Sequence, residues 1–155
     1  KGGSLRLLVA GYRKTVRTGG GMRLETDLRF ADVADSAIRA DWIVIPGLGL
    51  VSEQAIDSRL AHKDAQAAMA LLRQAPAGMR IGASCSAVFL LARSGLLDGR
   101  RATMTWWLAA LFRAQHPEVL LDETKMLVRD GRFLTACAPC PSRLDGIACR
   151  RNSRP

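Results

Sequence analysis

Short apolar runs alternate along this chain with segments whose apolar positions follow helical spacing. The clearest predicted strand is 41–47, which is dense in β-branched residues and stopped by a Pro-Gly pair. A second apolar run, 79–83, leads directly into a helix-like segment at 86–94. The run 5–11 predicts a further short strand, and the alternation at 22–26 predicts a half-exposed one.

Three segments have the character of helices. One is Ala-rich, covers 58–74 and ends before Pro76 and Gly78; a weakly patterned one covers 32–40, and a third runs from 106 to 116 before Pro117. The apolar positions that we expect on the buried face of the Ala-rich helix are Ile56, Leu60, Ala67, Ala68 and Leu71.

Strands separated by helices predict an α/β fold with an open, mainly parallel sheet and helices on both faces. Residues 126–135 form two short apolar runs around Asp130-Gly131, which predicts a small hairpin near the C-terminus. The last residues, 137–155, are rich in proline, cysteine and arginine and have little periodicity. We therefore expect an α/β domain over 1–136 and an irregular basic tail over 137–155.

Composition places the chain among soluble globular proteins. Its 155 residues are 48% hydrophobic and 24% charged, which suits one domain with its own core. No apolar run approaches the roughly 20 residues of a membrane-spanning helix, and the first residues lack the apolar stretch of a signal peptide. Four cysteines are too few and too clustered for a disulfide framework, so we expect a cytoplasmic protein with no membrane partner.

The net charge of +9 raises the hypothesis of a nucleic-acid-binding module. That hypothesis needs the arginines on one face, whereas they are scattered along the sequence. Aromatic residues make up only 5%, so there is little on which bases could stack. We do not expect this chain to bind DNA directly.

Cys85 lies between the predicted strand and the following helix. The first backbone N–H groups of a helix have no partner within it, and together with the helix dipole they favour a thiolate and an oxyanion beside it. Cys85 is therefore a candidate nucleophile or ligand contact. The alternative is a small buried side chain that only fills the turn.

Other motifs give weaker signals. Cys137-Ala-Pro-Cys140 with Cys149 resembles half of a zinc or redox motif, but no histidine is near, and we expect neither a metal nor a cofactor. Gly19–Gly21 lacks the Lys-Ser/Thr of a phosphate loop. The pair Trp106-Trp107 could stack on a ligand, but a place in the core or at a subunit interface is more typical.

Four segments resemble the ThiJ/PfpI domain, closest to the version at the N-terminus of AraC-type transcriptional regulators. They are 83–92, 95–103, Trp106 with 116–119, and 130–136. The corner Ile45-Pro46-Gly47 resembles the Val-Pro-Gly-Gly corner of that family, with Leu48 in place of the second glycine. The resemblance covers about 5–136 and implies a flavodoxin-like, class I glutamine amidotransferase-like fold. It also implies a first strand and helix before Leu5 and a helix-turn-helix domain after the sensor domain, both of which we expect to be missing here.

The family pattern has one departure with chemical consequences. Members with a complete dyad carry a histidine immediately before the tryptophan at position 106, where this chain has Thr105. A hydroxyl does not exchange protons at neutral pH as an imidazole does. The chain's two histidines, His62 and His116, are both at positions that look like solvated helix positions. Cys–His hydrolysis is therefore not expected.

The resemblance implies a catalytically inactive, ligand-sensing and dimerisation domain of an AraC-type regulator. Its partners would be a small-molecule ligand and a second copy of the chain, with DNA bound only through a domain absent here. The residues expected to line the ligand pocket, at the carboxyl ends of the parallel strands, are Pro46, Gly47, Cys85, Ser86, Thr105 and Trp106. The alternative is a cysteine-dependent enzyme of the same superfamily, with amidase, hydratase or glyoxalase-like activity. A histidine within reach of Cys85 would favour that alternative, and Thr105 facing Cys85 would favour the sensor.

Overall fold

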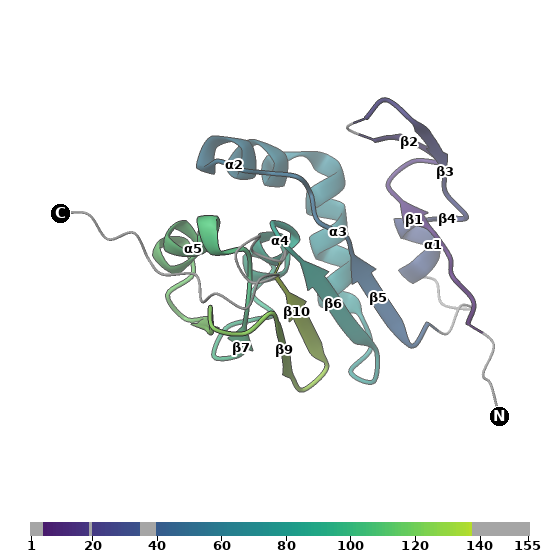
Figure 1. The fold of residues 1–155 in the computed structure, drawn as a ribbon. Coiled ribbons are helices and arrows are strands. Elements are labelled where there is room, and N and C mark those ends of the chain that lie inside the picture. The colour runs from purple at the N-terminus through teal and green to yellow at the C-terminus, as the bar shows by residue number, and fades with distance from the viewer. Residues whose placement is uncertain (1–4, 19, 35–39, 138–155) are drawn as a thin grey trace.

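The computed structural model describes residues 5–18, 20–34 and 40–137 (Figure 1). Its first elements are β1 (Ala10–Gly11), β2 (Thr15–Arg17), β3 (Arg23–Glu25), β4 (Leu28–Arg29), α1 (Phe30–Ala34), β5 (Trp42–Ile45), α2 (Glu53–Ala61) and α3 (Lys63–Gln74). They are followed by β6 (Arg80–Ser84), α4 (Ala87–Arg93), β7 (Arg101–Ala102), a 3₁₀ turn (Trp106–Leu108), α5 (Ala109–Gln115), β8 (Leu120–Leu121), β9 (Leu127–Asp130) and β10 (Phe133–Ala136). No helix in the described ranges is long and apolar enough to cross a membrane.

The central sheet has the strand order β5–β6–β10–β9. Strands β5, β6 and β10 are parallel, and Ile43, Ile81 and Phe133 lie opposite one another across them. Strand β9 is antiparallel to β10 and forms the expected hairpin. The predicted α/β fold, with an open and mainly parallel sheet and a C-terminal hairpin, is confirmed.

The core lies between the sheet and α4. Apart from its last residue, Arg93, this helix is buried along its whole length. The ring of Phe89 meets the ring of Phe112 on α5 edge to face, with centroids 5.0 Å apart. Ile81 and Phe133 of the sheet and Met69 of α3 belong to the same core.

The opposite side of the sheet, which we call the open sheet face, carries exposed apolar side chains. Because side chains alternate along a strand, Trp42 and Val44 point away from the core that Ile43 joins. Val44 is 70% exposed, and Leu127 on β9 is exposed as well. The Arg80 guanidinium lies 5.4 Å from the centre of the Trp42 ring and shields part of it.

The N-terminal segment differs from its prediction. Only Ala10–Gly11 of the predicted strand 5–11 forms a strand, and it pairs with β4 rather than with the central sheet. Leu5 and Leu7 are exposed, so the start of the apolar run that predicted a strand does not pack against the core of the described residues. A strand is present within 22–26 as β3, which forms a hairpin with β2, but all three of its residues are exposed rather than alternating.

The single helix expected over 58–74 is wrong, because the chain breaks at His62, whose backbone is extended. Arg59 and Asp64 bridge the break through two bonds of 2.7 and 2.8 Å. Those bonds from Arg59 hold the pKa of Asp64 below its usual value. The break also shifts the helical phase. The buried positions are therefore Ile56, Leu60, Ala65, Met69 and Leu72, whereas Ala67, Ala68 and Leu71 are half-buried.

The other helices follow their predictions more closely. The predicted helix 86–94 is α4, and the segment 106–116 begins with a 3₁₀ turn before α5. Of the predicted helix 32–40, positions 32–34 belong to α1, and 35–39 lie outside the described residues. All of the predicted tail after Cys137 also lies outside them.

Candidate functional site

Two parallel neighbours of the central sheet bring the predicted site residues together. The carboxyl ends of β5 and β6 lie at the same edge, where the chain continues into Gly47 and Cys85 respectively. A methyl group placed on Gly47 would lie 3.2 Å from the Cβ of Cys85 and 3.9 Å from its Sγ. The backbone of Gly47 therefore forms one wall beside the thiol.

Cys85 occupies a strained turn between β6 and α4. Its φ is +54°, the one positive value at a non-glycine residue in the described part of the chain. An L-residue there pays about 1–2 kcal/mol relative to ordinary helical backbone. The turn is fixed on both sides, because Cys85 N–H donates to the Ala136 carbonyl at 2.9 Å and the Cys85 carbonyl accepts from Val88 at 3.2 Å. The predicted strand-to-helix turn at Cys85 is thus present, and the thiol is half-buried.

Thr105 faces the thiol. The Sγ of Cys85 lies 4.0 Å from the Oγ1 of Thr105, which is fully buried. His62 is exposed at the break between α2 and α3. His116 packs against Phe112 of α5 and Phe89 of α4. The described residues therefore place a hydroxyl next to Cys85, and no histidine hydrogen-bonds to it.

Backbone donors surround the same point. The N–H groups of Gly47 and Ser86 have no hydrogen-bond partner within the described ranges. The buried Ser86 hydroxyl accepts from the N–H of Leu50 at 3.2 Å, which ties the loop after β5 to the turn at Cys85. Two free N–H groups beside a thiol can hold a carbonyl or carboxylate oxygen.

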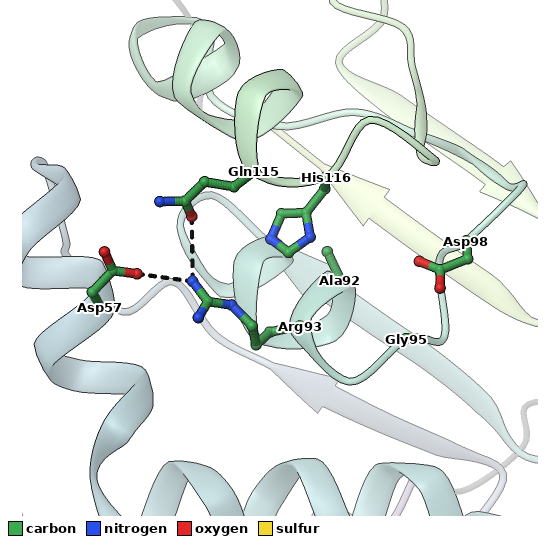
Figure 2. Close-up of a pocket in the computed structure, with 7 residues that line it drawn as sticks. All are labelled: Asp57, Ala92, Arg93, Gly95, Asp98, Gln115 and His116. Carbon is green, nitrogen blue, oxygen red and sulfur yellow. Dashed lines mark hydrogen bonds and ion pairs between the residues drawn. The ribbon is translucent and has the colours of Figure 1, made fainter.

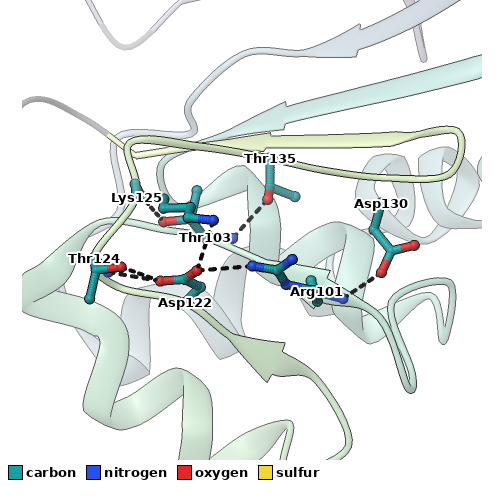
Figure 3. Close-up of polar contacts among 7 residues, drawn as sticks. All are labelled: Arg101, Thr103, Asp122, Thr124, Lys125, Asp130 and Thr135. Atoms are coloured by element: carbon teal, nitrogen blue, oxygen red, sulfur yellow. Dashed lines mark hydrogen bonds and ion pairs between the residues drawn. The ribbon is translucent and has the colours of Figure 1, made fainter.

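A polar network holds Thr103, two residues before Thr105 (Figure 3). The N–H of Thr103 donates to the hydroxyl of Thr135 on β10 at 2.8 Å, and both residues are buried. The Thr103 hydroxyl donates to the Lys125 carbonyl at 2.6 Å. These bonds attach the segment before Thr105 to the sheet.

Two aspartates extend this network toward the surface. Asp130 accepts from the N–H of Arg101 at 2.8 Å, and Asp122 accepts from the Arg101 guanidinium at 3.2 Å. Hydrogen bonds from Thr124 lower the pKa of Asp122 most, and the hydrogen bond from Arg101 lowers it further.

The sequence analysis missed Thr103 and Thr135. The one signal available was two threonines at positions where apolar residues would otherwise fill a buried strand.

The remaining predicted site residues have weaker placements. Pro46 and Trp106 are exposed, and no hydrogen bond joins either of them to Cys85 within the described residues. Trp106 and Trp107 are 51% and 41% exposed and meet edge to face, so neither ring enters the core. Cys137 is half-buried, whereas Cys140 and Cys149 lie outside the described residues. Among the residues described, no cluster of ligating side chains suits a metal ion.

Adding a methyl group at Gly47 is expected to narrow the site. Gly47→Ala places a Cβ 3.2 Å from that of Cys85, which should slow alkylation of the thiol several-fold and lower the free energy of unfolding by about 1–3 kcal/mol. Iodoacetamide labelling followed by mass spectrometry measures the rate. The matched control is Gly78→Ala, where the new methyl group meets nothing within 4 Å. Equal labelling rates in the two variants would show that Gly47 does not border the thiol.

A shallow, open cavity of about 610 Å³ lies at the other end of α4 from Cys85 (Figure 2). Its lining residues are Asp57, Ala92, Arg93, Gly95, Asp98, Gln115 and His116. The Nε2 atom of His116 is buried and has no hydrogen-bond partner in the described part of the chain. Burial, aided by the charge of Arg93 and opposed by that of Asp98, lowers the pKa of His116 below 6.5.

This lowered pKa predicts a pH dependence of stability. The unfolded chain binds a proton at His116 more readily than the folded chain, so folding is penalised as pH falls from about 7 toward the lower pKa of the folded state. Arg93, Asp98 and Asp57 are the charged groups that line the same cavity. Urea unfolding at pH 7.5, 6.5 and 5.5 should show this loss in the wild type and in His62→Gln. His116→Gln should show less of it, and an unchanged pH profile in that variant would contradict the prediction.

The family model for the DJ-1/PfpI family matches residues 1–143. No curated protein gives a significant match. Three solved structures share the fold, as follows.

The DJ-1beta of Drosophila melanogaster has a TM-score of 0.60 and 23% identity, over 81% of this chain and 61% of that one. A protein from Vibrio parahaemolyticus described as a "putative transcriptional regulator" has a TM-score of 0.65 and 21% identity, over 83% and 63%. Oxidised DJ-1 of Toxoplasma gondii has a TM-score of 0.62 and 23% identity, over 89% and 69%. The chain therefore spans a little over three fifths of the length of the first two.

Proposed function

The chain belongs to the DJ-1/PfpI family, and on that premise we propose that it is the ligand-sensing and dimerisation domain of an AraC-type transcriptional regulator. In this proposal the site at Cys85 binds a small molecule without turning it over. DNA is bound by a separate domain, and the bound ligand biases the arrangement of two such domains by its differential affinity for their states.

The observation that carries the proposal is the position of Thr105. Its buried hydroxyl lies 4.0 Å from the Cys85 thiol, where a proton-transferring group would have to stand. Threonine neither accepts the thiol proton nor returns it to a leaving group near neutral pH. The site thus has a nucleophile and oxygen-binding donors but no partner for a catalytic cycle within the described residues.

The ligand chemistry follows from the same atoms. The free N–H groups of Gly47 and Ser86 favour an oxygen that carries negative charge. The half-buried thiol beside them can lie against the carbon atom that is bonded to this oxygen. A small carboxylate or carbonyl compound satisfies both. The Vibrio parahaemolyticus protein described as a regulator adds support at the level of a shared fold.

Protection of the thiol tests ligand binding. We expect glyoxylate, which carries both a carbonyl and a carboxylate, to slow iodoacetamide labelling of Cys85 at millimolar concentration and to leave labelling of Cys137 unchanged. Cys137 serves as the internal control because it is also a half-buried cysteine. Equal protection of both thiols, or none, would contradict the proposed ligand class.

A cysteine enzyme of the same family is the second candidate. The positive φ of Cys85 favours it, because strained backbone at a turn often presents a nucleophile. Purified protein should be incubated with methylglyoxal, a primary amide and an isonitrile. The sensor proposal expects rates equal to buffer. Turnover by the wild type that disappears in Cys85→Ser would replace the sensor by the enzyme.

The dimer proposal rests on the two exposed tryptophans. Trp106 and Trp107 form one aromatic surface at the start of the α5 segment, and exposed tryptophans are enriched at protein interfaces. Multi-angle light scattering at several concentrations should give twice the chain mass, falling to the monomer mass in Trp107→Arg. Leu120→Arg, which also adds a charge at an exposed apolar position, should leave the mass unchanged. A monomer mass for the wild type would contradict dimerisation, and only the ligand-sensing part of the proposal would remain.

A further inference from the structure

The cavity at the far end of α4 is built from three helices that end or pass at one place. Asp57 comes from α2, Arg93 is the last residue of α4, and Gln115 is the last residue of α5, followed directly by His116. Asp98 lies in the turn that follows α4. Figure 2 shows the imidazole of His116 between Arg93 on one side and Asp98 on the other.

One end of the cavity carries Arg93, which is held in place by its neighbours. The Nη2 atom of Arg93 donates to Asp57 at 2.8 Å and to the side-chain oxygen of Gln115 at 3.3 Å. The amide of Gln115 in turn donates to Glu53 at 3.2 Å. Both Arg93 bonds use one nitrogen, so the guanidinium keeps donors for a further acceptor in a fixed orientation.

The other end is negative and unpaired. Within the described residues Asp98 makes no hydrogen bond or ion pair, and its side chain is exposed at the rim of the cavity. Since Asp57 already pairs with Arg93, the charge of Asp98 is the one that this lining leaves uncompensated. A ligand that carried only a negative charge would be repelled at this end.

The space between the two ends suits a short, mostly neutral body. The imidazole packs on Phe112 and Phe89, with ring centres 5.0 and 6.0 Å away, and these contacts fix its orientation. Arg93 and Asp98 both line the cavity beside this ring. Ala92 and Gly95 leave room beside it.

We propose that this cavity binds a small zwitterion of the free amino acid class, with its carboxylate on Arg93 and its ammonium group on Asp98. A zwitterion offers a carboxylate to the remaining donors of Arg93 and an ammonium group to Asp98, and it adds no net charge to the cavity. The site is separate from that of Cys85, because the seven residues of α4 put roughly 10 Å between its two ends. The proposal therefore does not depend on the function proposed for Cys85.

The two histidines of the chain allow a direct test on the intact protein. Their ring signals in long-range ¹H–¹⁵N NMR spectra are assigned with His62→Gln, and alanine is titrated to 20 mM at constant pH. We expect a saturable shift of the His116 signals and none of the His62 signals, since His62 is exposed at the α2–α3 break. Acetate and methylammonium, which each carry one half of the alanine charges, should give less than a tenth of that shift at the same concentration.

Two variants and one control locate the binding. Arg93→Gln removes the positive end, and Asp98→Asn removes the negative end while breaking no bond within the described chain; each should weaken alanine binding at least tenfold. Arg129→Gln, at an exposed arginine on β9, should bind as the wild type does. Absence of a His116 shift in the wild type, or binding unchanged in Asp98→Asn, would overturn the proposal. A shift produced equally by acetate would show an anion site instead.

Discussion

Replacing Phe89 by alanine is expected to lower the free energy of unfolding by about 3–5 kcal/mol, a large part of the stability of a small domain. Phe89 is fully buried in α4, meets Phe112 edge to face and also contacts His116. Its removal leaves a cavity between α4 and α5 that the packed sheet on the other side cannot fill. Urea unfolding followed by circular dichroism measures the change.

Leu120→Ala is the control for this variant. It is also a truncation to alanine, but Leu120 is 58% exposed, so the loss should stay within about 0.5 kcal/mol. A comparable loss in the two variants would mean that α4 is not the centre of the core. If the Phe89→Ala protein does not fold, Phe89→Leu is measured instead, and it should lose a smaller but measurable part of the free energy of unfolding.

Replacing Thr105 by histidine is expected to speed alkylation of Cys85 at neutral pH by about tenfold. This is less than the roughly hundredfold or greater contribution of a well-positioned acid–base group in an enzyme. An imidazole at the place of the Thr105 hydroxyl, 4.0 Å from the thiol, can take its proton and leave the reactive thiolate. Labelling with iodoacetamide at pH 6 to 8, resolved by cysteine, measures the rate.

Thr105→Val keeps the shape of the side chain and removes the hydroxyl, so it separates chemistry from packing. We expect it to label at the wild-type rate or slightly faster. A Thr105→His protein with native circular dichroism and an unchanged labelling rate would show that position 105 does not communicate with the thiol. Weak turnover in Thr105→His alone would indicate that the rest of a catalytic site survives in this chain.

The sequence predicted those parts of the fold that depend on local pattern. A run dense in β-branched residues became β5, the Asp130-Gly131 pair became the end of β9 and the start of the hairpin turn, and the small residues around Cys85 became a strand-to-helix turn. Each of these signals lies within a few consecutive residues, so no distant contact is needed to read it.

The missed features depend on contacts between distant segments. The helix break at His62 is held by Arg59 and Asp64, which are five residues apart; their side chains would not face each other on a continuous helix and meet only where the chain has broken. The bond between Thr103 and Thr135 joins positions 32 residues apart. Without the packing of the segment after β7 against β10, nothing in the sequence indicates that these two threonines meet.

His116 is a further residue whose environment depends on a distant segment. Its place before Pro117 suggested a solvated helix end, yet α4 brings Phe89 against the ring and buries one of its nitrogens. For the pocket at Cys85, the sequence named the right neighbours in Gly47, Ser86 and Thr105, because three turns at the ends of neighbouring elements converge there. That these residues bind a ligand stays a prediction.

Because of the open sheet face, the free energy of unfolding of this protein depends on the concentration of any molecule that binds there. Any molecule that covers Val44 and Trp42 binds the folded chain and not the unfolded one, since their alternation exists only in the paired strand. Its binding adds RT ln(1 + [L]/Kd) to the free energy of unfolding, about 2.7 kcal/mol at one hundred times Kd. A second copy of the chain would act in the same way, and the midpoint of thermal unfolding would then rise with protein concentration.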